Sequence, residues 1–370
     1  MNHQSCYSIA LSKIEGVGAL LYKTLVDHFG SAQAVFQASI TELQQVTHIG
    51  PGLANKIHTT SLLEAASVLL EKATQKGIKV IPYEAKSYPH RLKEIYNPPP
   101  LLYLRSAPTL NHERIVAIVG SRKPTPYGLA LVKQLVSQLA GNQVTIVSGL
   151  AYGIDIAAHQ AALAHELSTI GVLGSGLDML YPPLHSKIAK KMERKGGILS
   201  EYGLGIGPQP HHFPMRNRII AGLSDAVIIV EAGLKSGALI TAQYANAFGR
   251  EVFAFPGSTT SPQSRGCHQL IKKHQAHLMT DGSDLAYLMD WASIDQGAQK
   301  EEKVKYANLT PAGRCIVDQL ATFNEPVDDN TLICLTNLSP NALATELLQL
   351  SMHNIVDLLP GNRYQLRHFL

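Results

Sequence analysis

Six short runs of β-branched and other apolar residues, separated by segments of helical length, constrain the fold of this chain more than any other feature. Runs that are apolar along their whole length are typical of parallel strands with helices on both faces of the sheet. They fall between about residues 112 and 291 and predict an α/β fold with a Rossmann-like, doubly wound, mostly parallel sheet. The runs are RIVAIVG, QVTIVSG, STIGVLG, GILSEY, DAVIIVEA and EVFAFPG.

The sequence before this pattern has a different character. Residues 1–80 show helical periodicity broken by glycine pairs. The spacing in IGPGLANKI, Ile49–Ile57, fits a helix-hairpin-helix turn, whose free amides can hold a DNA phosphate. A plain helical turn or a protein-binding module fits the same spacing. A proline-rich connector without periodicity, Tyr88–Pro108, leads into the α/β region, which we place at 81–291.

The sequence after the α/β region predicts a linker and a small domain. Residues 292–308 are polar and poor in core-forming side chains, as in a linker. Residues 309–370 contain three helical segments followed by a β-hairpin, which predicts a winged-helix-like domain. The third helical segment, SPNALATELLQLS, has no Arg or Lys, so a protein-binding or regulatory role is favoured over reading duplex DNA.

Composition bounds the compartment and the partners. The 370 residues suffice for two or three domains, and a net charge of +4 with a pI near 8.7 mildly favours polyanionic partners. The four cysteines form no CxxC pair, which argues against a zinc site or a disulfide framework and fits a reducing compartment. No signal-peptide pattern and no apolar run of about 20 residues occurs, so we expect a cytoplasmic protein without a membrane span.

The loops that follow the predicted strands form the expected ligand site, because ligands of doubly wound sheets bind at the carboxyl ends of the strands. These loops combine glycine with small or hydroxyl residues, which lets an extended ligand approach the backbone. The first loop, Gly120–Gly128, lacks the G-x-G-x-x-G spacing, and the chain has no P-loop motif. Arg122 in this loop fits an anion held from the side, and pairing with a nearby carboxylate is the alternative. The other loops are Ser148–Asp155, Gly174–Asp178, Glu231–Thr241 and Pro256–Ser258.

The stretch HHFPMRNR, His211–Arg218, places two arginines just before a buried strand. Pro214 can begin a helix, which would put Arg216, Asn217 and Arg218 in its first turn. Cations oppose the helix macrodipole at that end, so their presence suggests that an external anion offsets the cost.

Two interpretations of these arginines compete. In the first, they bind DNA phosphates through their guanidinium forks while Phe213 stacks on a base. In the second, one arginine pairs with Glu201 or Glu231 and Phe213 belongs to the core. The second interpretation suits one arginine better than both.

Other polar residues favour structural roles. Asp155 and His159 lie one helical turn apart and could form an acid–base or metal pair, but a helix-capping acid and a packed histidine is the favoured interpretation. His211 and His212 are interpreted as loop surface. The chain has no G-x-S-x-G motif and no assembled nucleophile, base and orienting group. We therefore predict no catalytic residues, no metal and no cofactor.

Several long motifs together resemble the DNA-processing protein A family, also called DprA or Smf. They are ordered and dense over about residues 80–280. The family's usual glycine is absent at two places, where this chain has Ser106 and the segment Leu270–Ala276. The motifs are IVGSRKPTPYG, IVSGLAYGIDIAAHQAAL, GSGLDMLYPPLHSKIA, GGILSEYGLGIGPQPHHFPMRNRIIAGLS, VEAGLKSGALITAQYANAFGREVFAFPGS and SRGCHQLI.

The resemblance implies a non-enzymatic protein that binds single-stranded DNA in a basic pocket and self-associates as a homodimer. It also implies loading of the RecA recombinase onto incoming DNA during natural transformation, with displacement of single-strand-binding protein as an indirect partner. With the loop amide of Gly149 added, the expected DNA-binding residues are Gly120, Ser121, Arg122, Gly149, Phe213, Arg216, Asn217, Arg218, Ser236, Gly237 and Thr241.

Two other functions remain open from the sequence. Rossmann-like sheets also host nucleotide phosphoribohydrolases of the lysine-decarboxylase-like group, but the corresponding region here, EAGLKSGALITA, lacks their Pro-Gly-Gly-x-Gly-Thr-x-x-Glu motif. A pure protein-interaction adaptor is the third alternative, and it predicts no DNA binding.

Overall fold

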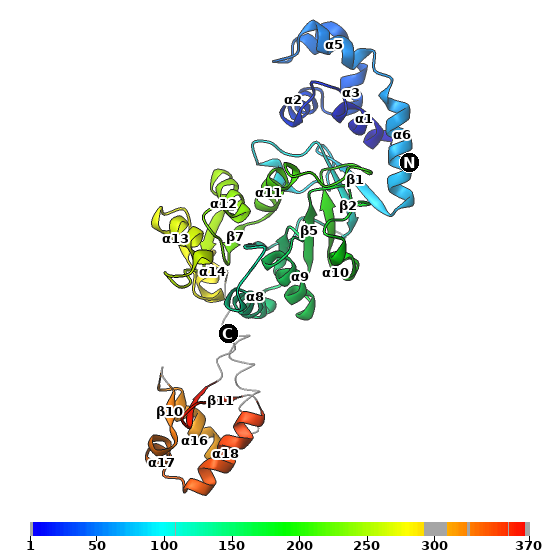
Figure 1. Ribbon diagram of the computed structural model, residues 1–370. Coiled ribbons are helices and arrows are strands. Elements are labelled where there is room, and N and C mark those ends of the chain that lie inside the picture. Colours follow the sequence, from blue (N-terminus) through cyan, green and yellow to red (C-terminus); the bar gives the residue numbers. More distant parts are fainter. Residues whose placement is uncertain (1–2, 108, 292–308, 324–325, 354, 367–370) are drawn as a thin grey trace. The chain divides into compact units, whose positions relative to one another are not determined.

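All six apolar runs form strands in the computed structural model, and they pair in parallel, so the predicted α/β sheet is confirmed. They belong to a nine-stranded sheet of order β1-β2-β6-β5-β4-β3-β7-β8-β9 (Figure 1). The chain runs outward from β3 to β6 and returns to the other side of β3 at β7, so the topological switch point lies between β3 and β7. The parallel strands are β3 (Ile115–Val119), β4 (Thr145–Ser148), β5 (Thr169–Leu173), β6 (Gly197–Ser200), β7 (Ala226–Ile229), β8 (Glu251–Ala254) and β9 (His277–Leu278).

The structure describes residues 3–107, 109–291, 309–323, 326–353 and 355–366. They form two compact units, residues 1–292 and residues 293–370. The predicted linker, 292–308, lies outside the described residues. No helix in the described ranges is long and apolar enough to span a membrane.

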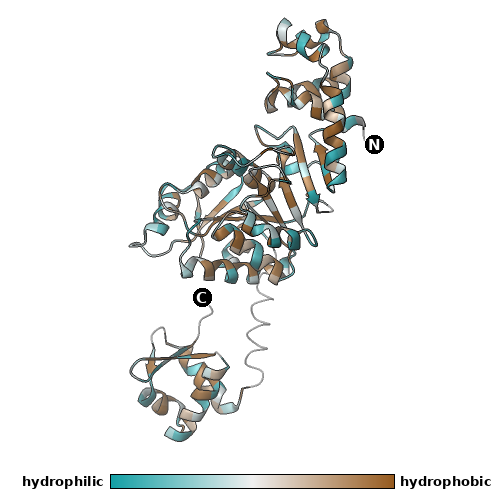
Figure 2. Cartoon of the chain, turned by 45° about the vertical axis from the view of Figure 1, so that its right-hand side comes forward, coloured by the Kyte–Doolittle hydropathy of each residue, from teal (hydrophilic) through white to brown (hydrophobic). Residues whose placement is uncertain are grey.

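Helices cover both faces of the sheet in the first unit. Three of them, α8, α9 and α10, pack along one face, and α11 and α12 cover the other (Figure 1). The strands between them are apolar while the outer helix faces are mixed (Figure 2), and β3, buried along its whole length, shows why its run is apolar throughout. The helices of this region are α8 (Pro126–Leu139), α9 (Ile154–Ala164), α10 (Ser186–Met192), α11 (His212–Leu223), α12 (Gly237–Ala247), α13 (Arg265–Lys272) and α14 (Gly282–Leu288).

The proline-rich connector contributes a strand to the sheet, which the sequence pattern did not predict. β1 (Ile78–Pro82) and β2 (Leu101–Ser106) pair antiparallel, and β2 also pairs antiparallel with β6. β1 therefore crosses the boundary between residues 80 and 81 that the sequence suggested. Local periodicity did not reveal these strands because the prolines between them interrupt it.

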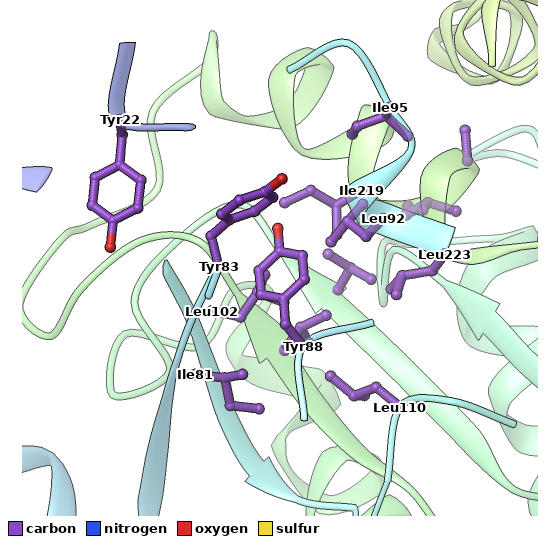
Figure 3. Packing of buried hydrophobic residues seen from close by; sticks show 14 of the residues in the cluster. Tyr22, Ile81, Tyr83, Tyr88, Leu92, Ile95, Leu102, Leu110, Ile219 and Leu223 are labelled. Atoms are coloured by element: carbon purple, nitrogen blue, oxygen red, sulfur yellow. The ribbon is translucent and has the colours of Figure 1, made fainter. Parts of the chain in front are cut away.

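Apolar side chains of the connector join it to the main core. Tyr88 and Leu92, the latter in α7 (His90–Lys93), lie near Ile219 and Leu223 of α11 in one buried cluster (Figure 3). The Tyr88 hydroxyl is also satisfied, because it donates to the carbonyl of Pro99 at 2.8 Å. The connector thus fixes α11, the helix that carries the FPMRNR sequence, against the rest of the unit.

The N-terminal helices attach to the sheet through Glu84, just beyond β1. The hydroxyls of Ser8 and Tyr22 donate to its two carboxylate oxygens at 2.6 and 3.1 Å. Burial and the Glu84 charge both raise the pKa of Tyr22. These helices are α1 (His3–Ser12), α2 (Ala19–Phe29), α3 (Ala32–Gln37), α4 (Ile40–Gln44), α5 (Pro51–His58) and α6 (Leu62–Gln75).

Both places where the family's glycine is absent adopt left-handed backbone conformations. Ser106, at the end of β2, has φ 67°, and His274, just after α13, has φ 54°. This region of backbone space favours glycine, which has no Cβ. At both places this chain has a conformation that glycine adopts more readily than the residues present.

The described residues of the second unit contain three helices and a small antiparallel sheet of order β10-β12-β11. The three predicted helical segments and the hairpin are present, and a short strand is added between the first two helices. Ile316, Leu332, Leu343 and Leu347 are among the buried residues of its separate core. The elements are α16 (Pro311–Leu320), β10 (Val327–Asp328), α17 (Asp329–Thr336), α18 (Pro340–Met352), β11 (Val356–Leu359) and β12 (Arg363–Leu366).

Candidate functional site

The loops after β3, β4 and β5 meet at the carboxyl edge of the sheet. Ile154, at the start of α9, donates its backbone N–H to the carbonyl of Ser121 at 3.1 Å. Gly153 has φ 81°, and a Cβ there would lie 2.2 Å from the same carbonyl oxygen. Glycine at 153 therefore allows the loop after β4 to pass directly beneath the loop after β3, which holds Arg122.

Arg122 is exposed and lies over an aromatic ring. Its Cζ is 5.5 Å from the centroid of the Phe213 ring, a cation–π arrangement. Among the described residues, Arg122 makes no ion pair with a carboxylate. The pairing alternative for Arg122 is thus not what the structure shows, and its guanidinium remains open to an anion from solvent.

Phe213 is half-buried and, besides Arg122, has an aromatic ring beside it. One of its edges would lie 3.1 Å from a Cβ at Gly174, so glycine after β5 makes room for the ring. Tyr181, from the same loop, lies 5.8 Å from Phe213 between ring centroids and is 42% exposed. The phenylalanine is therefore held at the rim of the site, neither in the core nor free on the surface.

Arg216 is buried, with only 3% of its surface exposed, and its Nε and Nη1 donors are used within the protein. Its Nη1 donates to the carbonyl of Gly149 at 2.7 Å and to that of Val172. Its Nε donates to the side-chain oxygen of Asn217 at 3.2 Å. α11 begins at His212, so Arg216 lies in its second turn, where the side chain reaches the ends of β4 and β5.

Asp155 is the electrostatic counterpart of Arg216. The carboxylate accepts from the amide of Gly149 at 3.1 Å, and burial raises its pKa while Arg216 lowers it. A Cβ at Gly149 would lie 2.6 Å from the Asp155 oxygen and 2.7 Å from Arg216 Nη2. Gly149 is buried between the two charges, and both its amide and its carbonyl are already bonded.

Arg218 pairs with Glu201, one of the two carboxylates that the sequence offered as a partner for an arginine of this stretch. Its Nη2 donates to the carboxylate, and both side chains are largely buried. Burial raises the pKa of Glu201, and the Arg218 charge opposes that rise. The pair links the second turn of α11 to the end of β6.

The other residues that were predicted to contact DNA lie around the start of α12. Ser236 caps this helix, because its hydroxyl accepts from the amide of Ala238 at 3.3 Å. Asn217 donates its side-chain amide to the carbonyl of the exposed Gly237 at 3.2 Å. Thr241 is buried. The loop after β7 is thus fastened to α11, and only its tip is accessible.

A carboxylate of the protein occupies the start of α8 at the switch point. The amide and the hydroxyl of Thr125 donate to Glu231 at 2.8 and 2.5 Å. Glu231 is buried, and a Cβ at Gly128 would lie 2.4 Å from its oxygen. Dinucleotide-binding proteins hold a pyrophosphate at this helix N-terminus. Here Glu231 occupies it, in agreement with the absence of the G-x-G-x-x-G motif.

His159 is packed into the domain as the sequence favoured, whereas Asp155 does not cap α9 and instead accepts from the amide of Gly149. Thr169 donates its hydroxyl to the carbonyl of Ile146, so His159 Nδ1 must donate to that hydroxyl, at 2.7 Å. Burial lowers the pKa of His159 to about 3. The described ranges contain no group of three His, Cys, Asp or Glu side chains placed to bind a metal.

His212 was predicted wrongly, and two tyrosines of the site were missed. His212 is buried, where a surface loop was predicted: its Nδ1 donates to the carbonyl of Gly174 at 3.2 Å and its ring stacks on Tyr202. Tyr152 and Tyr181 follow β4 and β5 and are exposed at the same edge. Their positions directly after predicted strands were a usable signal, since that is where ligand-facing residues lie.

The helix-hairpin-helix spacing corresponds to a real helix start, with Gly50 as the N-cap of α5. Gly50 and Gly52 are exposed, and a Cβ at either would meet no atom within 4 Å. The geometry confirms the predicted turn, and its role in binding phosphate stays a prediction.

Comparisons with known proteins identify the family to which a chain with this site is similar. A sequence profile for DNA recombination-mediator protein A matches residues 79–290. Protein Smf from Synechocystis sp. is 34% identical over 398 residues, covering 99% of this chain and all of that protein. DNA processing protein DprA from Bacillus subtilis is 44% identical over 200 residues, 54% of this chain and 67% of the relative.

Solved structures agree with the sequence match. The X-ray structure of DNA processing protein A from Streptococcus pneumoniae has a TM-score of 0.65 at 34% identity, covering 78% of this chain and 98% of that one. A structure of the Helicobacter pylori protein, which concerns its single-stranded DNA binding mode, has a TM-score of 0.52 at 32% identity and covers 57% and 95%. With more than half of the chain matched by the family profile and the whole of a relative covered, this chain belongs to the DNA recombination-mediator protein A family.

Proposed function

We propose that this protein binds single-stranded DNA at the carboxyl edge of its sheet and acts as a recombination mediator without catalysing a reaction. One observation carries the proposal: Arg122, exposed and without a carboxylate partner among the described residues, lies 5.5 Å from the Phe213 ring at the edge where such sheets bind ligands. The single-stranded DNA binding of the Helicobacter pylori relative supports it.

The residues of the site divide into contacts and supports. Arg122 holds a phosphate, and Phe213 offers its ring to a base, with Tyr181 beside it. Arg216 and Arg218 take supporting roles, because each is buried with acceptors of its own. Their contribution to DNA binding is the position of α11 and, for Arg216, an added positive potential beneath the site.

The proposal is tested with Arg122→Ala and Phe213→Ala in a gel-shift salt series on single-stranded oligonucleotides. Loss of one phosphate contact should lower the magnitude of the salt slope by about 0.7 for Arg122→Ala. Loss of stacking should weaken Phe213→Ala binding by about 1–3 kcal/mol with little change in that slope.

Lys133→Ala is the matched control, since Lys133 is an exposed cation on α8. It should bind as the unaltered protein does. Folded Arg122→Ala and Phe213→Ala proteins with unchanged affinity would rule out the site.

We further propose that the DNA-bound protein is a homodimer that loads RecA and helps to displace single-strand-binding protein, as the family resemblance implies. RecA filament growth on DNA covered by single-strand-binding protein should accelerate with this protein and not with Arg122→Ala. A purely monomeric protein in sedimentation, with or without DNA, would contradict the dimer.

We also propose that the second unit is a winged-helix-type module with a protein-binding or regulatory role. The order of its helices and strands supports this, as does α18, whose sequence contains no Arg or Lys. Removing residues 309–370 should leave single-strand affinity within about twofold, and a loss comparable to Arg122→Ala would refute the role.

No observation favours the phosphoribohydrolase alternative. The loop after β7 lacks the motif of that group, and Glu231 is already bonded to Thr125. Free base released from nucleoside monophosphates by the purified protein would overturn the non-enzymatic proposal.

A further inference from the structure

Helix α10 presents a row of unpaired cations on its solvent face. Lys187, Lys190 and Lys191 on the helix, and Arg194 in the turn after it, are all exposed, while Ala189 and Met192 face the core. None of the four makes an ion pair or a hydrogen bond through its side chain within the described part of the chain. We call these four residues the α10 strip.

Neighbouring charges do not neutralise the α10 strip. Lys195, next in sequence, is paired with Glu166 at 2.8 Å, and a nearby acid, Glu193, faces Arg105 at 3.8 Å. Like charges three and four residues apart destabilise a helix. A polyanion bound along the strip would relieve that repulsion.

The α10 strip begins at the proposed DNA site. His185, directly before α10, donates its Nδ1 to the carbonyl of Leu150 at 2.8 Å, and its ring lies 5.1 Å from that of Tyr152, both in the loop after β4. Upstream on the same segment, Tyr181 lies beside Phe213. The first turn of α10 is thus attached to the rim that carries Tyr152 and Tyr181.

From that rim the α10 strip leads away from the site. α10 packs against β5 and β6 beyond α9 (Figure 1), and the chain after it enters β6 at Gly197, the opposite edge of the sheet. From Lys187 to Lys191 the helix rises about 6 Å, and Arg194 follows in the turn after Met192. This spacing suits successive phosphates of one extended strand.

We propose that the α10 strip is a second, sequence-independent binding surface that extends the path of single-stranded DNA beyond the Arg122–Phe213 site. The inference rests on the proposed function. It predicts that the α10 strip adds to the affinity only when the DNA strand is long enough to reach it. This distinguishes its role from that of the Arg122–Phe213 site.

The test compares a short oligothymidine of about 6 nucleotides, within the range of single-strand sites, with one of about 20, which is longer than that range. The strip variant is Lys187→Gln, Lys190→Gln, Lys191→Gln and Arg194→Gln together. It should bind the short strand within twofold of the unaltered protein. On the long strand it should lose at least tenfold in affinity at low salt, with a salt slope smaller by about 2–3.

A control variant removes the same charge elsewhere, with Lys13, Lys133, Lys272 and Lys273 all changed to Gln; these are exposed and make no ion pair with any residue that the structure describes. It should bind both strands almost normally. The α10 strip proposal would be overturned if the control variant lost as much affinity as the strip variant. It would also be overturned if the strip variant lost equal affinity for both strand lengths, or lost none for the long strand. If the unaltered protein binds neither strand, the proposed function itself fails.

Discussion

Helix α11 and the loop after β3 both bring arginine to the same edge of the sheet, yet they use it in opposite ways. Arg216 and Arg218 in α11 are buried and bonded to carbonyls or a carboxylate. Arg122 in the loop is exposed and has an aromatic ring as its neighbour. The role of a cation therefore depends on the acceptors that the fold brings to it and not on its sequence neighbours.

The two regions remain coupled through charge. Burial, opposed in part by Asp155, lowers the pKa of Arg216 to about 10, and Arg122 adds to the lowering. Arg216 is still protonated at neutral pH. Its charge adds to the positive potential near Arg122, offset in part by the Asp155 carboxylate, while its Nε and Nη1 donors are bonded inside the protein.

The largest expected effect is on stability, from Arg216→Met. The change leaves the Asp155 carboxylate buried without its countercharge, which typically costs about 3–5 kcal/mol in the free energy of unfolding. Urea denaturation measures the loss, and Arg122→Met is the control that should unfold normally. A loss below about 1 kcal/mol would remove the distinction between the two regions.

The second test addresses the residue between the buried charges. Gly149→Ala places a Cβ within 2.7 Å of both Asp155 and Arg216. We expect a destabilisation of about 1–3 kcal/mol from overpacking, measured by thermal or urea unfolding. Gly237→Ala, at an exposed position where a Cβ meets nothing within 4 Å, is the matched control.

The free energy of unfolding should also depend on pH, because of the buried residue His159. His159 has a pKa lowered to about 3 from an ordinary value near 6.5, so between these values the unfolded chain binds a proton that the folded chain does not. Stability is therefore lost as pH falls below about 6.5, by about 1 kcal/mol between pH 7 and pH 5.5.

Urea unfolding at the two pH values, with His159→Gln alongside, isolates this effect. The difference between the two proteins removes the contribution of Asp155, whose raised pKa acts with the opposite sign. Equal pH dependence in both proteins would show that His159 does not stay neutral in the folded state.

The smallest expected effect on stability comes from changing the exposed Arg122. Arg122→Ala should change the free energy of unfolding by no more than about 0.5 kcal/mol, because its side chain is exposed and makes no ion pair with the described residues. A loss of more than 1 kcal/mol, measured by urea unfolding, would mean that Arg122 supports the fold as Arg216 does.

The sequence predicted the parallel strands because their runs are apolar throughout. It predicted Arg122 as a residue of the binding site because Arg122 follows closely after such a run. It did not predict β1 and β2, since their pairing joins segments separated by a proline-rich stretch. The partners of Arg216 are backbone carbonyls of Gly149 and Val172, far away in sequence. Carbonyls leave no mark in a sequence, so no local pattern could show that the guanidinium is occupied.

The attachment of the N-terminal helices at Glu84 determines how the chain can be shortened. A fragment beginning at residue 81 would cut β1 in two, leave β2 as a bare sheet edge, and remove both Ser8 and Tyr22, the hydroxyls that donate to Glu84. A fragment that keeps only the region matched by the family profile, residues 79–290, also lacks both hydroxyls, so the Glu84 carboxylate loses these two donors. Deletion studies of DNA binding should keep residues 1–292 together, so that a lost activity reports on the site and not on an opened sheet.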